Sequence, residues 1–290
     1  MVGVDALTDW YDDHARELPW RAADRTPWGV LVSEVMLQQT PVARVEPVWR
    51  AWLARWPEPA DLAGADVAQV LRAWGGLGYP RRALRLHAAA CAVVERHAGQ
   101  VPDDEAALLA LPGVGAYTAA AVRAFAFGRR AVVLDTNVRR VLARALGGQA
   151  LPPPHLTVAE SATADALLPA DDATAARTVA ALMELGALVC TARAPRCAEC
   201  PLRATCAWLA DDRPPDAHAQ QRRRQPWQGT DRQARGRVLA ALRAAPGPVA
   251  VVDLVWPDAA QLDRCVVALA ADGLVVHDPV AATVRLPSSR

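Results

Sequence analysis

The chain has 290 residues, of which 52% are hydrophobic, and its formal net charge at pH 7 is only +1. This length allows two or three packed units, and a charge so close to zero excludes a protein that attracts its partner through the charge of the whole molecule. No run reaches the roughly 18 apolar residues of a membrane span, and the acidic N-terminus lacks the basic and apolar parts of a signal peptide. We therefore expect a cytoplasmic protein with no membrane segment, whose thiols stay reduced.

Apolar residues recur with the period of an α-helix along most of the chain, and proline and glycine interrupt this pattern. Few strands are expected before residue 210. The sequence therefore predicts a mainly helical protein. We place its helices near residues 3–17, 28–38, 41–55, 60–64, 67–73, 78–97, 103–110, 115–126, 135–146, 156–168, 171–188 and 201–209.

The segment LPGVGAYTAAAVRAFAFG, residues 111–128, joins two of these helices through a turn with two glycines. Neither Gly113 nor Gly115 has a Cβ atom, so a ligand can approach the backbone closely. The free N–H groups of the helix that begins here favour an anion such as a DNA phosphate. A tight connection between two helices is the alternative interpretation.

The segment VVLDTNVRRVLAR, residues 132–144, places Asp135 at the start of a helix that carries Arg139 and Arg140. On local grounds, a carboxylate at a helix N-terminus is an N-cap. Residues 123–144 hold six Arg and one acidic residue, which gives this region a local charge of +5. All 32 basic residues of the chain are Arg, and the sequence contains no lysine.

Four of the six cysteines, Cys190, Cys197, Cys200 and Cys206, lie within 17 positions at the spacing C-x6-C-x2-C-x5-C. Disulfides are disfavoured if the protein is cytoplasmic. Zinc ribbons usually pair two C-x2-C knuckles across a longer loop, whereas this segment has one such knuckle. A [4Fe–4S] cluster takes four Cys thiolates and suits one compact segment better. A zinc site remains the alternative.

The C-terminal part begins with a polar, proline-containing segment at residues 211–233 with the basic centre QRRRQPW, which indicates a linker. Residues 234–290 follow as a helix, a short helix, a longer helix at 259–272 and two strand-like runs, GLVVHD and ATVRL. This order resembles a winged helix. The third helix has one Arg against two Asp, so we expect its apolar side to face the core of this unit rather than DNA.

The order of LPGVGAYTA, LDTNV and the four-cysteine segment resembles the helix-hairpin-helix DNA glycosylases of the endonuclease III superfamily, over about residues 5–210. RELPWR at 16–21 and SEVMLQQT at 33–40 are similar to the adenine DNA glycosylases of the MutY type, which remove adenine mispaired with 8-oxoguanine. The resemblance implies a mainly α, two-lobed helix-hairpin-helix fold with an iron–sulfur cluster loop, plus the small winged-helix-like α+β unit. It also implies a [4Fe–4S] cluster held by the four cysteines.

The same resemblance implies how the chain is divided. A glycosylase core would cover residues 1–210. Its parts would be a six-helix lobe at about 24–130 with the helix-hairpin-helix at 103–126, and a cluster lobe made of 1–23 and 131–210. The basic linker 211–233 and the unit 234–290 complete the chain.

Removal of a base from a duplex requires the nucleotide to be flipped out and the departing base to be protonated, and two carboxyl groups share such work in glycoside hydrolysis. The apolar neighbours of Glu34 raise the pKa of a carboxyl group, and the resemblance implies that Glu34 protonates adenine at N7; an ordinary, partly exposed helical glutamate is the alternative. Asp135 is expected to stay ionised at the helix N-terminus and to stabilise the sugar cation or add to it. Tyr117 and Asn137 match positions that support this centre by hydrogen bonding.

The resemblance also assigns residues that contact DNA. Those that contact or wedge the opposite base are Leu37, Gln39, Thr40 and Tyr79. Those that line the adenine pocket are Arg16, Trp20 and Arg21. Those assigned to DNA binding around the hairpin and the Asp135 helix are Gly113, Gly115 and Arg139.

The resemblance thus implies a monofunctional DNA glycosylase of base excision repair that hydrolyses the N-glycosidic bond of adenine opposite 8-oxoguanine or guanine and leaves an abasic site. Relatives that also cleave the strand use a lysine in the position of Tyr117, and the lack of lysine predicts no lyase activity. A related glycosylase for thymine or uracil opposite guanine, and a non-catalytic DNA-binding iron–sulfur regulator, are the alternatives. The expected partner is double-stranded DNA with an adenine mispair, bound by a nucleoid-associated monomer.

Overall fold

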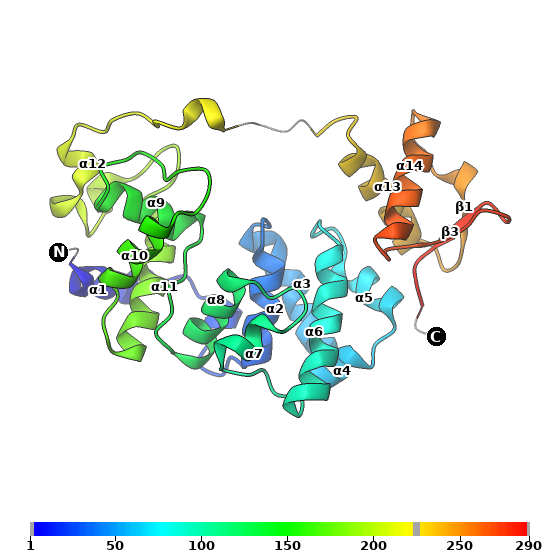
Figure 1. Ribbon diagram of the computed structural model, residues 1–290, viewed down its shortest axis with the longest axis horizontal. Coiled ribbons are helices and arrows are strands. Elements are labelled where there is room, and N and C mark those ends of the chain that lie inside the picture. Colours follow the sequence, from blue (N-terminus) through cyan, green and yellow to red (C-terminus); the bar gives the residue numbers. More distant parts are fainter. Residues whose placement is uncertain (1–2, 223–226, 289–290) are drawn as a thin grey trace. The chain divides into compact units, whose positions relative to one another are not determined.

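The structure, a computed structural model, describes residues 3–222 and 227–288 and is mainly helical (Figure 1). The first eleven expected helices are present, and their ends lie within three residues of the predicted positions. They are α1 (Val4–His14), α2 (Pro27–Leu37), α3 (Val42–Arg55), α4 (Pro59–Ala63), α5 (Val67–Trp74), α6 (Arg81–His97), α7 (Glu105–Leu109), α8 (Ala116–Phe127), α9 (Thr136–Ala145), α10 (Val158–Leu167) and α11 (Asp172–Leu188). A further short turn, η1, covers Pro19–Arg21.

The twelfth expected helix, over residues 201–209, is wrong for most of its length. The structure has two short 3-10 turns, η2 (Cys197–Glu199) and η3 (Arg203–Thr205), and then one helical turn, α12 (Ala207–Ala210). Pro201 has no backbone N–H to donate, and Cys206 has an extended backbone with φ −75° and ψ 110°. The cysteine segment therefore turns repeatedly instead of continuing as one helix.

The first of two compact units comprises Met1–Val30, Asp103–Leu109 and Gly115–Arg224. Its core forms where α11 packs against α1, α8 and α9. Helix α9 turns one apolar stripe to this core, because its buried apolar residues recur three and four positions apart. These residues are Val138, Val141, Leu142 and Ala145.

The second unit comprises Leu31–Pro102, Ala110–Val114 and Gln225–Arg290. Residues 31–36 of α2 are all buried in it, as expected for a helix that is apolar on nearly all sides. Helices α4 and α5 pack on α6. The ring of Trp52 meets those of Trp56 and Trp74 edge to face, at centroid distances of 4.7 and 5.7 Å. Three aromatic rings thereby join α3 to the end of α5.

Residues 231–288 of the second unit, here called the tail, have the expected winged-helix-like order. Helices α13 (Asp231–Ala244) and α14 (Ala259–Ala271) pack together. The antiparallel sheet has the order β1-β3-β2, built from β1 (Val249–Ala250), β2 (Val276–Asp278) and β3 (Thr283–Arg285), with the 3-10 turn η5 (Val251–Asp253) after β1. The sequence did not predict β1, because two residues are too short to show alternation. The apolar side of α14 is buried, as predicted.

Polar contacts within the second unit join the tail to α5 and α6. Asp272, at the end of α14, accepts a hydrogen bond from Arg235, and its Oδ1 lies 3.3 Å from Nη1 of Arg81. Nη2 of Arg72 donates to the carbonyl oxygen of Ala245 over 3.2 Å. The tail is therefore held at its own α13 and α14 ends by arginines from neighbouring helices.

The two units divide the chain differently from the lobes expected from the sequence. Helices α7 and α8, expected in the lobe at about 24–130, cluster with the first unit, and the tail clusters with the second. The boundaries named from the sequence stay a prediction. Four residues at the centre of the expected linker, 223–226, lie outside the described residues.

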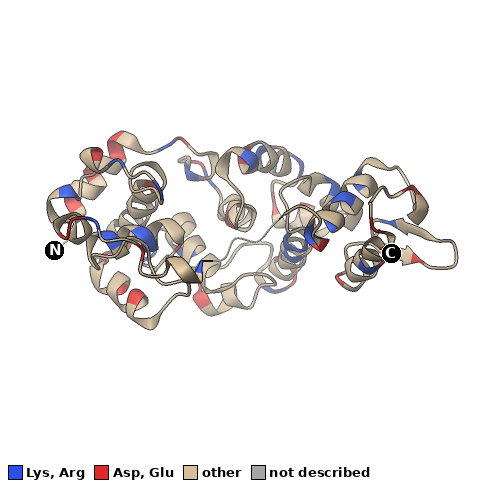
Figure 2. Cartoon of the chain, turned by 90° about the horizontal axis from the view of Figure 1, so that it is seen from above, with Lys and Arg blue, Asp and Glu red and all other residues tan. Residues whose placement is uncertain are grey.

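Positively and negatively charged residues occur along both units (Figure 2), in keeping with the small net charge. Among the helices that the structure describes, none is long and apolar enough to cross a membrane. Any attraction for a charged partner must therefore come from local groups rather than from the net charge of the molecule.

Candidate active site and cysteine loop

Glu34 lies in α2 of the second unit and is only 6% exposed. Its helical neighbours Val30, Leu31 and Val35 are buried as well. Burial by itself disfavours the charged form of a carboxyl group. The structure thus places Glu34 among buried residues of α2, which contradicts the alternative of a partly exposed helical glutamate.

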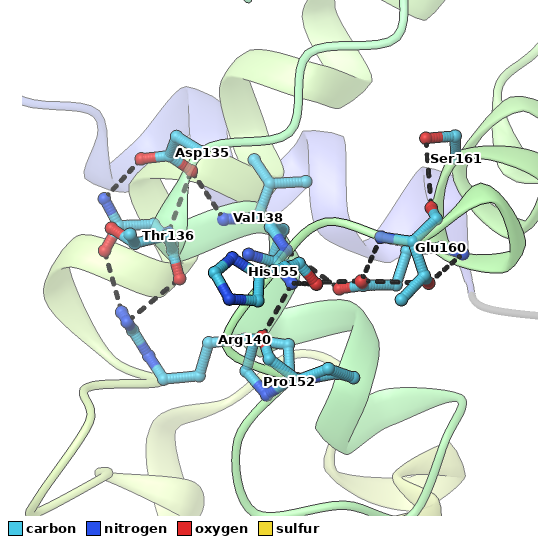
Figure 3. Close-up of polar contacts among 12 residues, drawn as sticks. Asp135, Thr136, Val138, Arg140, Pro152, His155, Glu160 and Ser161 are labelled. Atoms are coloured by element: carbon cyan, nitrogen blue, oxygen red, sulfur yellow. Dashed lines mark hydrogen bonds and ion pairs between the residues drawn. The ribbon is translucent and has the colours of Figure 1, made fainter. Parts of the chain in front are cut away.

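Asp135 lies in the first unit and is the N-cap of α9 (Figure 3). Its Oδ1 accepts hydrogen bonds from the backbone N–H groups of Asn137 and Val138, over 2.9 and 2.7 Å, and its Oδ2 accepts one from Nδ2 of Asn137 over 2.8 Å. Burial raises the pKa of Asp135 above its ordinary value, while these hydrogen bonds and the charge of Arg140 act in the opposite direction. The carboxylate is therefore buried but held by donors that favour its charged form.

Arg140 connects the carboxylate of Asp135, through Asn137, to residues 190–206, here called the cysteine loop. Its Nη2 donates to Oδ1 of Asn137 over 2.7 Å and to the carbonyl oxygen of Gly186 over 2.8 Å, and its Nε donates to the carbonyl oxygen of Cys190 over 2.7 Å. A Cβ atom on Gly186 would meet Cβ of Asn137 at 2.7 Å. Asn137 is thus fixed from both sides, and its orientation fixes that of Asp135.

The four cysteines of the loop form no disulfide and are partly buried. Burial raises the pKa of the Cys200 thiol to about 11, and the other three thiols act in the same direction. Nη1 of Arg144 donates to Sγ of Cys190 over 3.3 Å. Within the described ranges, no three His, Cys, Asp or Glu side chains come together as ligands of a single metal ion.

The hairpin between α7 and α8 contains both predicted glycines. Gly113 has φ +81°, and a Cβ atom there would lie 2.7 Å from Cβ of Arg85, so no other residue fits this position. Gly115 is the N-cap of α8 with φ −101°, and a Cβ atom there would meet nothing within 4 Å. Only Gly113 is therefore required by the packing of the chain itself.

Gly113→Ala is expected to weaken DNA binding by displacing the hairpin from Arg85, because both the positive φ and the contact at 2.7 Å oppose a methyl group. Gly115→Ala is the matched control for packing and should leave the melting temperature nearly unchanged. Thermal unfolding and DNA titration of both variants measure these effects. Equal melting temperatures for the two variants would contradict this account of Gly113.

Gln39 and Tyr79, both predicted to contact the opposite base, are exposed and have positive φ values of 58° and 48°. Thr40 is instead buried, and its hydroxyl group donates to the carbonyl oxygen of Leu77 over 3.1 Å. Leu37, at the end of α2, is partly buried. The positive φ values of Gln39 and Tyr79 are uncommon in residues other than glycine, and such conformations tend to occur at functional sites.

Arg16 and Arg21, predicted to line the adenine pocket, both pair with Glu184 of α11. Oε1 of Glu184 lies 2.5 Å from Nε of Arg16, and Oε2 lies 2.7 Å from Nη1 of Arg21. The side chain of Glu184 is fully buried. Trp20, which lies between the two arginines in the sequence, is buried as well. The structure thus brings the two predicted arginines together on an acid that the sequence analysis did not predict.

Arg139 is placed differently from the sequence prediction, which assigned it to DNA. Its side chain is only 12% exposed and pairs with Glu160 over 2.8 Å, and its Nη2 also donates to the carbonyl oxygens of Pro153 and His155 (Figure 3 shows His155 and Glu160). This arginine holds the loop between α9 and α10.

Tyr117, in the first turn of α8, packs against the core that α8 shares with α11.

The sequence analysis did not predict two further candidate residues, Glu184 and Arg82. A single acid inside the apolar run VAALMELGAL was a signal that could have marked Glu184 as paired. Arg82 belongs to the pair Arg81–Arg82, and only the structure shows that the second of these is buried, at 7% exposure.

Comparison with known proteins shows the family to which the chain belongs. The model of the HhH-GPD superfamily base excision DNA repair protein matches residues 32–163. An adenine DNA glycosylase of Mycobacterium tuberculosis is 52% identical over 274 residues, which are 93% of this chain and 89% of that protein.

Two solved structures share the fold. A thermostable thymine-DNA glycosylase has a TM-score of 0.64 and 28% identity, over 72% of this chain and 95% of its own. A non-covalent endonuclease III–DNA complex has a TM-score of 0.61 and 25% identity, over 72% and 94%. The helix-hairpin-helix glycosylase fold expected from the sequence is thereby confirmed, and the chain belongs to the HhH-GPD superfamily of base excision DNA repair proteins, in the family of the adenine DNA glycosylases.

Proposed function

We propose that the protein is a monofunctional adenine DNA glycosylase that removes adenine opposite 8-oxoguanine or guanine and leaves an abasic site. The observation that carries this proposal is one buried carboxyl group in each unit: Glu34 lies in the buried part of α2, and Asp135 accepts hydrogen bonds from the N–H groups of α9. Two carboxyl groups divide the roles of acid and anion in glycoside hydrolysis. Membership of the family supports adenine as the base. We further propose a nucleoid-associated, cytoplasmic monomer that acts on double-stranded DNA.

The reaction requires the adenine nucleotide outside the stack of the duplex. Glu34 then transfers its proton to N7 of adenine, the bond between C1′ and N9 breaks, and its electron pair leaves with the neutral base. The positive charge left on the sugar is stabilised by the carboxylate of Asp135. A water molecule adds its oxygen to C1′ and releases a proton, which leaves free adenine and an abasic site.

Asn137 acts as a positioning residue in this scheme, because it donates to Oδ2 of Asp135 while Arg140 holds its own Oδ1. A carboxylate held before the substrate arrives does not have to reorganise during the reaction. Tyr117 stands where a strand-cleaving relative would need an amine, and the chain has no lysine that could form a Schiff base with the opened sugar. Reaction therefore stops at the abasic site.

The four cysteines fit a [4Fe–4S] cluster, which takes four thiolates. They lie on one winding segment, and Arg144 and the backbone N–H of Leu202 donate to the sulfur atoms of Cys190 and Cys200. Donors of this kind favour the thiolates that iron requires. A cluster bound here would hold residues 190–206 together and so stabilise the fold, rather than supply a chemical step.

Protein purified without oxygen is expected to contain about four irons per chain and no stoichiometric zinc, because a cubane takes one thiolate at each iron. Cys197→Ser should lower the iron content and weaken DNA binding, since Arg193, Arg196 and Arg203 lie on the same loop. Cys91→Ser, outside the loop, is the control and should keep its iron. One zinc and no iron in the metal analysis would overturn the cluster.

Single-turnover base release from defined duplexes tests the proposed function. Adenine opposite 8-oxoguanine and adenine opposite guanine should both release the base, and borohydride should trap no covalent adduct. The likeness to the thymine-DNA glycosylase structure makes thymine or uracil opposite guanine the second candidate substrate. Release from those duplexes and none from adenine would replace the proposal, and a trapped adduct in high yield would refute monofunctional chemistry.

A further inference from the structure

Arg82 is a buried arginine at the start of α6 that connects two loops of the second unit. Its Nη1 donates to the carbonyl oxygens of Val35, Met36 and Gln38, over 2.9, 3.1 and 2.5 Å. Its Nη2 donates to Oγ1 of Thr40 and to the carbonyl oxygen of Gly78, each over 3.1 Å. One guanidinium group therefore closes the end of α2 and the turn before α6 onto each other.

The same guanidinium group lies over two aromatic rings. Its Cζ is 5.3 Å from the centroid of Trp74 and 5.3 Å from that of Tyr79. Nε1 of Trp74 donates to the carbonyl oxygen of Gly78 over 2.9 Å, which fixes the turn from the other side. Among the described residues, Nε of Arg82 has no hydrogen-bond partner. Removing this cation from water is costly, so the contacts of its other two nitrogens must compensate.

Each of the two loops that Arg82 joins carries an exposed residue. Gln39 is exposed, and Tyr79 is 46% exposed. Both have a left-handed backbone conformation that residues other than glycine rarely adopt. Buried contacts are thus used to present an amide and an aromatic ring at the surface. An amide can form two hydrogen bonds with the edge of a base, and an aromatic ring can stack on or separate bases.

We infer that Arg82 is a positioning residue that fixes Gln39 and Tyr79 as one recognition pair for the base opposite the excised adenine. This inference rests on the proposed function, because it assumes a base left without its partner. Arg82 itself acts through the two loops and does not touch the DNA. A lysine could not replace Arg82, because an ammonium group is compact and has three hydrogen-bond donors. A guanidinium group is planar, has five N–H donors in a fixed geometry and stacks on aromatic rings.

The test uses single-turnover kinetics and DNA titration with Arg82→Lys and Arg82→Met. The readout is the preference for adenine opposite 8-oxoguanine over adenine opposite guanine, measured as the ratio of the binding constants. Arg82→Lys is expected to lower this ratio by about 5- to 150-fold, which is the discrimination that one good bidentate contact to a base supplies. The rate of base release at saturating enzyme should change far less, because Glu34 and Asp135 are intact.

Arg96→Lys and Arg96→Met are the matched controls, since Arg96 is exposed in the last turn of the same helix. Both should leave the preference unchanged. Because Arg82→Met can also impair folding, Arg82→Lys is combined with Gln39→Ala and Tyr79→Ala in a mutant cycle. Once both recognition side chains are removed, Arg82→Lys should have no further effect on the preference.

The inference is overturned if Arg82→Lys keeps the full preference, or if its effect simply adds to that of Gln39→Ala and Tyr79→Ala. It is also overturned if saturating base release and preference fall together, since that outcome indicates a general loss of structure. Failure of the proposed function is a separate result, visible as a wild-type protein that releases no adenine from either duplex.

Discussion

Glu34→Gln and Asp135→Asn are each expected to lower the single-turnover rate of adenine release by at least about 10²-fold, within the range of 10²–10⁴ that general acid–base steps contribute. The glutamine has the shape of Glu34 but no proton to transfer, and the asparagine has no charge to stabilise the sugar. Binding to a duplex with adenine opposite 8-oxoguanine should remain nearly intact, because neither carboxyl group is needed to hold the strand.

Two conservative variants control for the loss of a carboxyl group elsewhere. Asp171→Asn changes an exposed N-cap, whose Oδ2 accepts from the N–H of Thr174 over 2.7 Å, and Glu95→Gln changes an exposed position on α6. Both should keep the wild-type rate. If Glu34→Gln released adenine at a near-normal rate, the proton donor would have to be another group.

The pH dependence of the wild-type rate follows from the same site. Burial raises the pKa of Asp135 above 3.8, and the reaction requires its carboxylate form. The rate should therefore fall as the pH falls through this raised pKa, at a higher pH than an ordinary aspartate would give. An acid limb that is unchanged in Asp135→Asn would assign that limb to another group.

Glu184→Ala is expected to destabilise the protein by about 3 kcal/mol, the lower end of the range for removing one partner of a buried ion pair. The lower end applies because the side chain of Arg16 is 35% exposed, so water can rehydrate one of the two arginines left behind. Chemical denaturation measures the loss. Glu46→Ala, which breaks an exposed pair with Arg50 within α3, is the control and should have little effect.

The contribution of Glu184 also depends on pH. Burial by itself raises the pKa of Glu184, but the hydrogen bonds and charges of Arg16 and Arg21 outweigh it, so the pKa in the folded protein lies below 4.5. The stabilisation is therefore fully present above the unfolded value of 4.5 and is lost as the pH falls through the folded pKa. The stability difference between the wild type and Glu184→Gln should shrink over that range, and a constant difference would contradict the ion pair.

The amino-acid sequence by itself determined eleven of the twelve predicted helices and indicated the candidate site residues. Helix α9 could be read from local signals, since apolar residues recur every three or four positions and Asp135 supplies its N-cap. Glu34 could be read in the same way, as one acid among apolar neighbours. The cysteine spacing predicts a cluster. The apolar pattern wrongly predicted a helix at residues 201–209, where the structure has the short turns η3 and α12, because such a pattern does not show where the backbone turns.

Only the tertiary structure decided which charged side chains serve the fold and which remain available to DNA. Arg16, Arg82 and Arg139 look alike in the sequence, yet their partners lie 168, 47 and 21 positions away, at Glu184, Val35 and Glu160. A guanidinium group makes several hydrogen bonds with whatever acceptors surround it, and long-range packing sets those acceptors. The role of an arginine is therefore decided where distant segments meet, and no local pattern records it.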